Sequence, residues 1–204
     1  MSNSMNKKRP GRPKLTDSPN TKNQILHTAS QLFMTYGYEN VSMEQVAESS
    51  QVTKASVYYY FNNKATLFTT AVSNMFNRVR KHTEQLLESH KGLKQRLYEV
   101  TVDHLKRPHV DFETLLKEAS PSLSEDNIHV IRTAESGVND ALEAIFKQAV
   151  ENEEISTTNP LLLAHAFSTV TMIRNKKALI EELGGAEKTA SALVELFWNG
   201  IEPR

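Results

Sequence analysis

Residues 42–61 read SMEQVAESSQVTKASVYYYF and contain two short helical patterns a few residues apart. In the first pattern, Ser42 is followed three residues later by Gln45. This is the spacing of a capping box, in which each side chain accepts a hydrogen bond from the other residue's backbone N–H. The spacing predicts a short helix from residue 43 to about residue 49.

The second pattern begins at Thr53, whose hydroxyl can cap a short helix that runs to about Tyr60. Ser56 offers a further capping hydroxyl, and Val57 supplies an apolar contact inward. Two short helices joined by three or four residues are typical of a helix-turn-helix. The sequence therefore predicts a helix-turn-helix near residues 43–61.

The chain on either side of this motif is also patterned as helix. Apolar residues fall at helical spacing from Ile25 to Tyr36, and Gly37 then favours a helix end. Residues 63–90 can form one long helix that joins this head to the rest of the chain. Residues 1–19 contain several prolines and no periodicity, so we expect a flexible arm there.

The remainder of the chain is a series of helical segments interrupted by proline or glycine. We expect helices at about 93–106, 111–119, 124–152, 159–181 and 186–200. The fold class is then all-α, with about nine helices. The predicted organisation is an arm over 1–19, a helix-turn-helix domain over 20–64, and a larger helical domain over 65–204.

Composition excludes several kinds of chemistry. Of the 204 residues, 39% are hydrophobic and 24% charged, as in average soluble globular proteins. The absence of cysteine excludes disulfides, thiol nucleophiles and thiolate zinc sites. No stretch approaches the roughly 18 apolar residues of a membrane span. We expect a soluble, cytoplasmic protein with no membrane partner, no cofactor and no metal site.

The net charge of zero conceals a segregation of charge along the chain. Residues 1–64 hold eight Lys or Arg and four acids, whereas residues 65–204 hold sixteen and twenty. The positive N-terminal part is suited to a polyanion.

The run VAESSQVTKASVYYYF at residues 46–61, followed by Asn63-Lys64 and Leu67-Phe68, resembles the signature of the TetR (tetracycline-repressor) family. The segment LVELFWNGI at residues 193–201 resembles the final helix of that family. The resemblance implies a bacterial transcriptional regulator that binds a palindromic operator as a homodimer. It further implies a repressor that a small-molecule ligand releases from DNA.

Two positions depart from the family pattern. Gln51 stands where the family usually has glycine, and Ala55 stands where it has glycine or another small residue. Gln51 is therefore expected to adopt a left-handed backbone conformation, at a cost of roughly 1 to 2 kcal/mol relative to glycine.

The predicted recognition helix begins at Thr53 and presents short side chains to the major groove, which is about 12 Å wide. Lys54 can donate to guanine or to a phosphate, and Ala55 can contact a thymine methyl group. Ser56 can hydrogen-bond with little discrimination between bases. These three residues are the candidates for direct base readout.

The resemblance implies that Tyr58 and Lys64 hold phosphates and that Tyr59 and Tyr60 lie at or near the DNA. Ser42 adds a hydroxyl at a helix N-terminus, where a phosphate is favoured, although capping alone would explain it. The alternative for the whole segment is a three-helix packing element with ordinary core tyrosines.

The basic arm offers a second mode of contact. The segment Arg9-Pro10-Gly11-Arg12-Pro13-Lys14 resembles the core of an AT-hook. Such an arm can lay Arg12, with Arg9 beside it, in the narrow minor groove of A·T-rich DNA. The alternative is a solvated, solubilising tail.

The last helix carries apolar residues on more than one side, which predicts packing on two faces. The resemblance implies a four-helix bundle between two copies, built from the last two helices. An intramolecular core alone is the alternative. The candidate interface residues are Leu163, Ala166, Phe167, Val170, Ile173, Ala190, Leu193, Val194, Phe197 and Trp198.

The expected effector is a small, largely apolar molecule that changes the spacing of the two recognition helices. Candidate pocket residues are aromatic, polar or adaptable side chains on otherwise apolar helices. They are Tyr98, His104, Phe112, His165, Met172 and Arg174, each of which has ordinary core or surface packing as its alternative.

Two other classes of protein remain as alternatives. A di-iron bundle enzyme needs Glu-x-x-His pairs, but no histidine of this chain has glutamate three residues before it. Nucleophile-elbow and phosphate-loop motifs are also missing, so we expect no enzyme. A helical interaction or architectural DNA-binding protein without an inducer pocket stays open.

Overall fold

The computed structural model describes residues 19–107, 111–156 and 159–201. Within these ranges the regular structure is helical, which confirms the predicted all-α class. Ten α-helices and two 3₁₀ turns occur there, against about nine helices expected. They are α1 (Pro19–Tyr36), α2 (Met43–Ser49), α3 (Lys54–Tyr60), α4 (Lys64–Leu87), α5 (Leu93–Lys106), α6 (Phe112–Ala119), η1 (Ser120–Ser122), α7 (Glu125–Glu151), α8 (Pro160–Thr171), η2 (Met172–Asn175), α9 (Lys177–Glu182) and α10 (Ala186–Trp198).

Local signals place the helix boundaries around the helix-turn-helix. The Ser42 side chain and Gln45 form the predicted capping box at the start of α2. The Thr53 hydroxyl caps α3 by accepting from the backbone N–H of Ser56. Between the two helices Gln51 has φ 54°, which confirms the left-handed conformation expected where the family has glycine.

One predicted helix was wrong: residues 159–181 do not form a continuous helix. Helix α8 ends at Thr171, η2 follows, and α9 begins at Lys177. Residues 168–171 read STVT, a run of poor helix formers. The Thr171 hydroxyl donates to the Ser168 carbonyl, and such side-chain bonds to the backbone compete with helical pairing.

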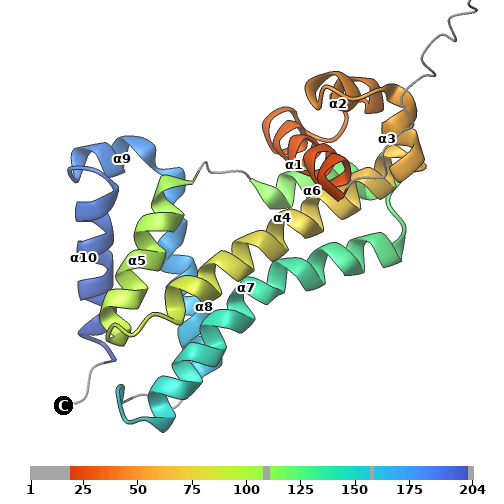
Figure 1. The fold of residues 1–204 in the computed structure, drawn as a ribbon. Coiled ribbons are helices and arrows are strands. Elements are labelled where there is room, and N and C mark those ends of the chain that lie inside the picture. The colour runs from red at the N-terminus through yellow and green to blue at the C-terminus, as the bar shows by residue number, and fades with distance from the viewer. Residues whose placement is uncertain (1–18, 108–110, 157–158, 202–204) are drawn as a thin grey trace, which may run out of the picture.

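Two long helices organise the molecule. Figure 1 shows α4 and α7 side by side, with α1, α2 and α3 around one end of α4 and with α5, α8, α9 and α10 gathered toward the other end. None of the described helices is both long enough and apolar enough to cross a membrane.

The apolar core of the head (residues 20–64) extends into the body (the described residues from 65 onward). Phe33 of α1, Tyr38 and Phe68 of α4 stack around one another, with both other rings edge-on to Phe68 at 5.0 Å. Leu115 of α6 and Ile131 of α7 are buried in the same cluster. Burying side chains of this size contributes roughly 1.5–3 kcal/mol each. Residues 20–64 thus share a core with α4, α6 and α7.

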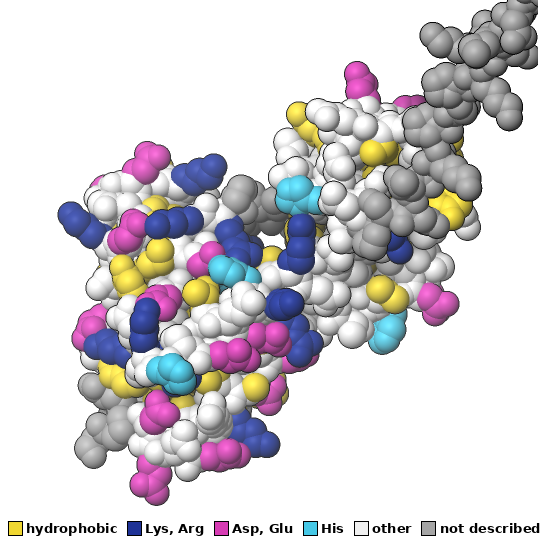
Figure 2. Space-filling model, in the orientation of Figure 1, with side chains coloured by type: hydrophobic (Ala, Val, Ile, Leu, Met, Phe, Trp, Pro, Cys, Tyr) yellow, Lys and Arg dark blue, Asp and Glu magenta, His cyan; other side chains and the backbone are white. Residues whose placement is uncertain are grey.

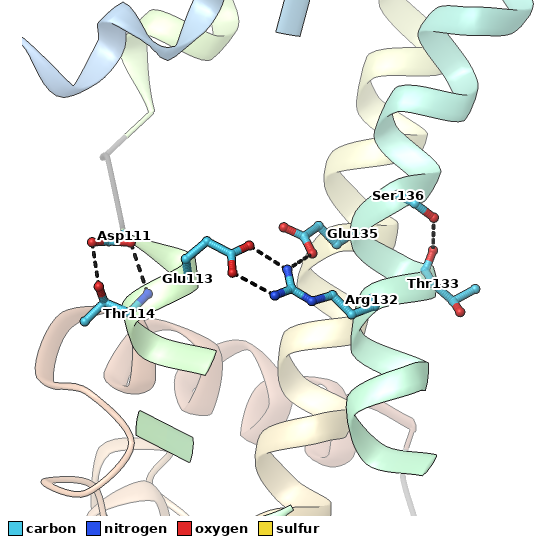
Figure 3. Close-up of polar contacts among 7 residues, drawn as sticks. All are labelled: Asp111, Glu113, Thr114, Arg132, Thr133, Glu135 and Ser136. Atoms are coloured by element: carbon cyan, nitrogen blue, oxygen red, sulfur yellow. Dashed lines mark hydrogen bonds and ion pairs between the residues drawn. The ribbon is translucent and has the colours of Figure 1, made fainter. Parts of the chain in front are cut away.

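Helix α6 is also fixed by charge. The Arg132 guanidinium of α7 donates to both carboxylate oxygens of Glu113 in α6, at 2.6 and 2.7 Å. It also donates to Glu135 one helical turn further along α7, at 2.7 Å (Figure 3). These contacts hold the first turn of α6 against α7.

Candidate nucleic-acid interface

The outer face of α3 is exposed along its length. Thr53, Lys54, Ala55, Tyr58 and Tyr59 all lie on it, and Tyr59 is 62% exposed. Val57 lies on the opposite side, fully buried in the core of the head. An amphipathic helix with an aromatic and cationic outer face has the shape and chemistry that a nucleic-acid groove accepts.

Ser56 does not lie on this outer face. It is 7% exposed, and its hydroxyl is hydrogen-bonded to the hydroxyl of Thr53 at 2.8 Å. Its backbone N–H donates to the same Thr53 oxygen at 3.1 Å. Ser56 is a predicted readout residue, but its side chain belongs to the cap of α3. Spacing alone could not distinguish the two roles, because one helix start offers both.

Lys54 is paired within the head. Its ammonium group forms an ion pair with Glu44 of α2 and lies 5.6 Å from the centre of the Tyr58 ring. The pair raises the pKa of Lys54 and lowers that of Glu44. Both side chains are exposed, so Lys54 can leave Glu44 for a stronger anion.

Lys64 has a structural contact that the sequence analysis missed. Its ammonium group donates to the backbone carbonyl of Glu39 at 3.2 Å and lies 4.4 Å from the centre of the Tyr38 ring. An ammonium group has three donors, so this contact leaves others available to a phosphate. Lys64 thereby holds the loop between α1 and α2.

The other predicted contact residues have mixed placements. Ser42 is partly buried and occupied by its capping box. Tyr60 is half-buried against the core of the head, with its ring 5.1 Å from that of Tyr59. Arg9 and Arg12 lie outside the described residues.

The positive charge of residues 1–64 is not spread evenly along that part of the chain. Residues 1–18 hold five Lys or Arg and one acid, whereas residues 19–64 hold three of each. Figure 2 shows acidic and basic side chains interspersed over the body, and few charges on the visible face of the head. The positive charge of residues 1–64 therefore comes from the first 18 residues.

The six candidate pocket residues do not form one group. His104, Arg174 and Tyr98 lie in one region, where α5 packs against η2. Phe112 packs edge-on against Phe76 in the core of the head, with ring centres 4.8 Å apart.

The remaining two pocket candidates, His165 and Met172, are exposed, and Met172 is 62% exposed. Periodicity cannot tell which face of a helix turns inward.

Among the clefts that the described residues line are two beside α5. One, of about 550 Å³, lies between α4, α7 and the start of α5, where Arg80, Leu87, Arg96 and Ile145 are among its walls. The other, of about 450 Å³, surrounds the first turn of α5 beside Trp198. Neither includes a predicted pocket residue.

The predicted dimer stripe is divided between the protomer core and its surface. Leu163, Phe167, Ala190 and Val194 are buried within the protomer. The other predicted interface residues, Ala166, Val170, Ile173, Leu193, Phe197 and Trp198, are partly exposed.

The most exposed large apolar side chains of α8, η2 and α10 are not among the predicted interface residues. They are Leu162 at 63%, Met172 at 62% and Leu196 at 74%. Four of the predicted interface residues thus pack inside the protomer, and other apolar side chains of the same elements are exposed.

Known proteins share both the motif and the fold. Residues 25–71 match the family described as "Bacterial regulatory proteins, tetR family". The biofilm operon icaADBC HTH-type negative transcriptional regulator IcaR of Staphylococcus epidermidis is 27% identical over 126 residues, which cover 59% of this chain and 66% of that protein. The chain spans two thirds or less of the length of the curated relatives it matches.

Solved structures at low identity share the fold. E. coli NemR in its reduced form has a TM-score of 0.72 at 20% identity, covering 90% of this chain and 100% of NemR. AibR in complex with isovaleryl coenzyme A and operator DNA has a TM-score of 0.60 at 21% identity, covering 86% and 97%.

The relatives are regulators and not enzymes, in agreement with the expectation for this chain. Residues 25–71 thus match the tetR family of bacterial regulatory proteins, and the described fold is similar to that of a TetR-family structure.

Proposed function

We propose that this protein is a cytoplasmic transcriptional repressor that binds a palindromic operator as a homodimer and is released by a small-molecule effector. The observation that carries this proposal is the exposed outer face of α3 within a helix-turn-helix. The fold shared with AibR, whose structure contains isovaleryl coenzyme A and operator DNA, supports both halves of the proposal.

In the proposed complex, α3 enters the major groove. Lys54 and Ala55 read base edges, since they are exposed at the start of the helix. Tyr58 and Tyr59 contact phosphates from the same face, with Tyr60 at the edge. The N-terminus of α2, capped by Ser42, and the free donors of Lys64 add phosphate contacts.

The arm supplies most of the electrostatic attraction in this proposal. Because residues 19–64 carry no net charge, the basic residues of 1–18 are the main source of counterion release on binding. Arg9 and Arg12 are assigned to the minor groove beside each half-site.

The proposed dimer forms through α8, η2 and α10. Leu162, Met172 and Leu196 are exposed large apolar side chains on these three elements, and burying them in an interface would favour association. A twofold axis through these helices would carry one head on each side. Two heads reading successive major grooves must lie about 34–36 Å apart.

Helix α4 connects each head to the body, so an effector that tilts α4 changes this separation. In this proposal residues 20–64 act as the DNA-binding domain and residues 65–204 as the effector-binding and dimerisation domain.

An effector must bind the DNA-incompetent state more tightly than the competent one. A coupling free energy of about 1–3 kcal/mol shifts DNA affinity roughly 5 to 150-fold.

The test begins with selection of binding sites from random duplex DNA by the full-length protein. Fluorescence anisotropy then gives the DNA affinity of the selected site at several salt concentrations. We expect twofold symmetric sites and an affinity that falls with salt. Selected sites without twofold symmetry would contradict the dimeric operator.

A matched pair of variants tests the dimer. Leu196→Glu places a charge on the exposed apolar face and is expected to yield monomers in light scattering, with weakened operator binding. Glu182→Gln, an exposed change on α9, serves as the control and is expected to remain dimeric. If Leu196→Glu also remains dimeric, the interface lies elsewhere.

The alternative is an architectural DNA-binding protein without an effector. A screen for small molecules that lower operator affinity distinguishes the two, because only the repressor has an effector to find.

A further inference from the structure

The region where α5 meets η2 contains a buried histidine without a partner. His104 is 8% exposed, and its Nε2 atom has no hydrogen-bond partner among the described residues. A buried polar atom left unpaired costs about 1–3 kcal/mol, so native structures rarely keep one without a reason. One such reason is a ligand that accepts from or donates to that atom.

A second unpaired group interacts electrostatically with His104, from the η2 turn that packs against α5. Arg174 of η2 is partly buried and makes no hydrogen bond or ion pair in the described part of the chain. Every other arginine in that part has a partner: Arg78 has His27, Arg80 has Glu84, Arg96 has Leu87 and Glu154, Arg107 has Asp103, and Arg132 has Glu113 and Glu135. Arg174 is thus the exception.

The nearby carboxylate is already engaged. One oxygen of Asp103 accepts from Nε of Arg107 at 2.8 Å and pairs with its Nη2 at 2.5 Å. The other oxygen lies 3.2 Å from Nε2 of His82. Asp103 therefore leaves the charge of Arg174 without a partner of its own.

The electrostatic environment of His104 also favours binding of an anion. Burial, Arg174 and Arg107 together lower the pKa of His104 to about 4, against the weaker opposing effect of Asp103. Burial and Arg107 also lower the pKa of Arg174. The region is thus positive and holds a neutral imidazole beside a desolvated guanidinium.

An apolar surface adjoins these groups. Tyr98 and Val102 of α5, Ile173 of η2 and Leu193 of α10 pack, partly buried, on the small cluster of Leu105, Ile180 and Ala190. Ile173 directly precedes Arg174 in the chain. A ligand held by Arg174 would therefore have apolar and aromatic side chains close by.

We propose that Arg174 and His104 bind the carboxylate of a small organic acid, whose apolar part packs against the side chains around Tyr98 and Ile173. This inference rests on the proposed effector-responsive function and names the chemical class of the effector. The planar fork of a guanidinium matches a carboxylate, and one unpaired arginine balances one negative charge. Inorganic phosphate has no apolar part to pack against the side chains around Tyr98 and Ile173, so it fits the region less well.

Carboxylate binding at this site should be coupled to protonation of His104. A bound carboxylate favours the protonated imidazole, so it raises the pKa of His104 from its low ligand-free value. Binding then takes up protons, and affinity increases as the pH falls. The other titratable or charged groups facing His104 are Arg174, Arg107, Asp103 and His82.

The experiment uses the full-length protein at constant ionic strength and pH 6. Benzoate and octanoate are the probes, benzyl alcohol and 1-octanol are their neutral analogues, and inorganic phosphate is the third arm. Isothermal titration calorimetry and thermal shift measure binding. We expect at least one carboxylate to bind and raise the melting temperature, with little effect of its alcohol or of phosphate.

Two variants locate the site. Arg174→Gln is expected to weaken carboxylate binding roughly tenfold or more, since it removes a charge-assisted contact. Arg80→Gln makes the same change at an arginine paired with Glu84 and is expected to bind like the wild type. Equal binding of acid and alcohol, or equal binding by Arg174→Gln and wild type, overturns the proposal. Failure of both carboxylates to bind also overturns it.

Proton uptake on carboxylate binding is a further readout, and it would be absent if His104 had only a structural role. Calorimetry of the same carboxylate in two buffers of different ionisation enthalpy is expected to give different apparent enthalpies for the wild type. The difference should disappear in His104→Asn. Identical apparent enthalpies in the wild type would overturn the protonation of His104 on carboxylate binding.

Operator binding separates this inference from the proposed function. The wild type without ligand is expected to bind the selected operator, whatever the result of the carboxylate titrations. If the wild type binds no DNA, the proposed function fails. If it binds operator but no carboxylate, only the present inference fails.

Discussion

A carboxylate oxygen of Glu118 in α6 accepts a hydrogen bond at 2.8 Å from the backbone N–H of Glu39, in the loop between α1 and α2. On the same residue, the carbonyl oxygen of Glu39 accepts from Lys64 of α4. Both polar backbone groups of one loop residue are thus held by side chains from other helices. Helix α6 is in turn fixed to α7 through Glu113 and Arg132 (Figure 3). This arrangement links the body to the loop that precedes the helix-turn-helix.

Removing the Glu118 carboxylate should free the amide of Glu39. In Glu118→Ala, we expect the amide hydrogen of Glu39 to exchange faster than in the wild type, because it loses its acceptor. Glu118→Gln keeps an acceptor oxygen and should retain much of the protection. Hydrogen exchange followed by NMR measures both. Equal protection in all three proteins would mean that the contact does not persist in solution.

Gly37 faces the same carboxylate and should not tolerate a side chain. Its φ of 84° is left-handed, and an added Cβ would lie 2.8 Å from Oε2 of Glu118. Gly37→Ala is expected to lower the free energy of unfolding by roughly 1–2 kcal/mol from backbone strain, with a further steric loss. Denaturant unfolding measures this loss.

The control for Gly37 is Gly200→Ala, where the nearest atom lies at an ordinary 3.4 Å. Adding Glu118→Ala to Gly37→Ala should relieve only the steric part. A Gly37→Ala protein as stable as wild type would contradict the described loop conformation.

The ion pair between Lys54 and Glu44 predicts opposite effects of two neutralising changes. Lys54→Ala should relax base preference at one operator position, with a loss of about 1–3 kcal/mol there. Glu44→Ala releases Lys54 and removes a negative charge near the phosphates, so it should tighten DNA binding and steepen its salt dependence. Anisotropy titrations against operator variants measure both. Weaker binding by Glu44→Ala would show that the pair positions Lys54 for DNA.

Features set by neighbouring residues could be predicted from the sequence. The cap at Thr53, the capping box at Ser42 and the left-handed Gln51 depend on contacts within a few residues, and all three were confirmed. Features set by tertiary packing could not. The pairing of Lys54 with Glu44 joins different helices, and the break after Thr171 contradicts an apolar pattern that continues through it.

The same limit applies to the candidate sites. Helical periodicity identified the apolar stripe of α8 and α10, but it could not tell that Phe167 and Val194 pack within the protomer while Leu196 is exposed. His104 and Arg174 were chosen as polar residues on apolar helices, and their lack of partners is visible only in the structure. Their role in binding an effector stays a prediction.

Deleting residues 1–18 should change the salt dependence of DNA binding more than its base preference. This segment holds the excess positive charge of residues 1–64, so its loss should reduce the magnitude of the salt slope by about 0.9 for each phosphate contact removed. If Arg9 and Arg12 enter the minor groove, the loss of affinity should be largest on sites with A·T-rich flanks. Equal loss on all flanks would reduce the arm to a nonspecific cationic tail.

Burial of His104 predicts that stability falls in mild acid. Its pKa is lowered from 6.5 to about 4 in the folded protein, chiefly by burial and then by Arg174 and Arg107. The unfolded chain therefore binds a proton at a higher pH than the folded chain does. The contribution of the neutral imidazole to stability is fully present above pH 6.5 and is lost progressively as the pH falls to about 4. The loss of stability then reaches the order of 1–3 kcal/mol. Urea unfolding at several pH values should show this slope in the wild type.

His104→Asn should lose that slope, whereas His129→Asn, at an exposed position on α7, should keep it. Other groups also titrate in this range, so the difference between the two variants isolates the histidine. A carboxylate bound at Arg174 should flatten the slope of the wild type, because it stabilises the protonated imidazole in the folded state. Parallel pH profiles for the wild type and His104→Asn would mean that solvent already reaches His104 in the folded protein.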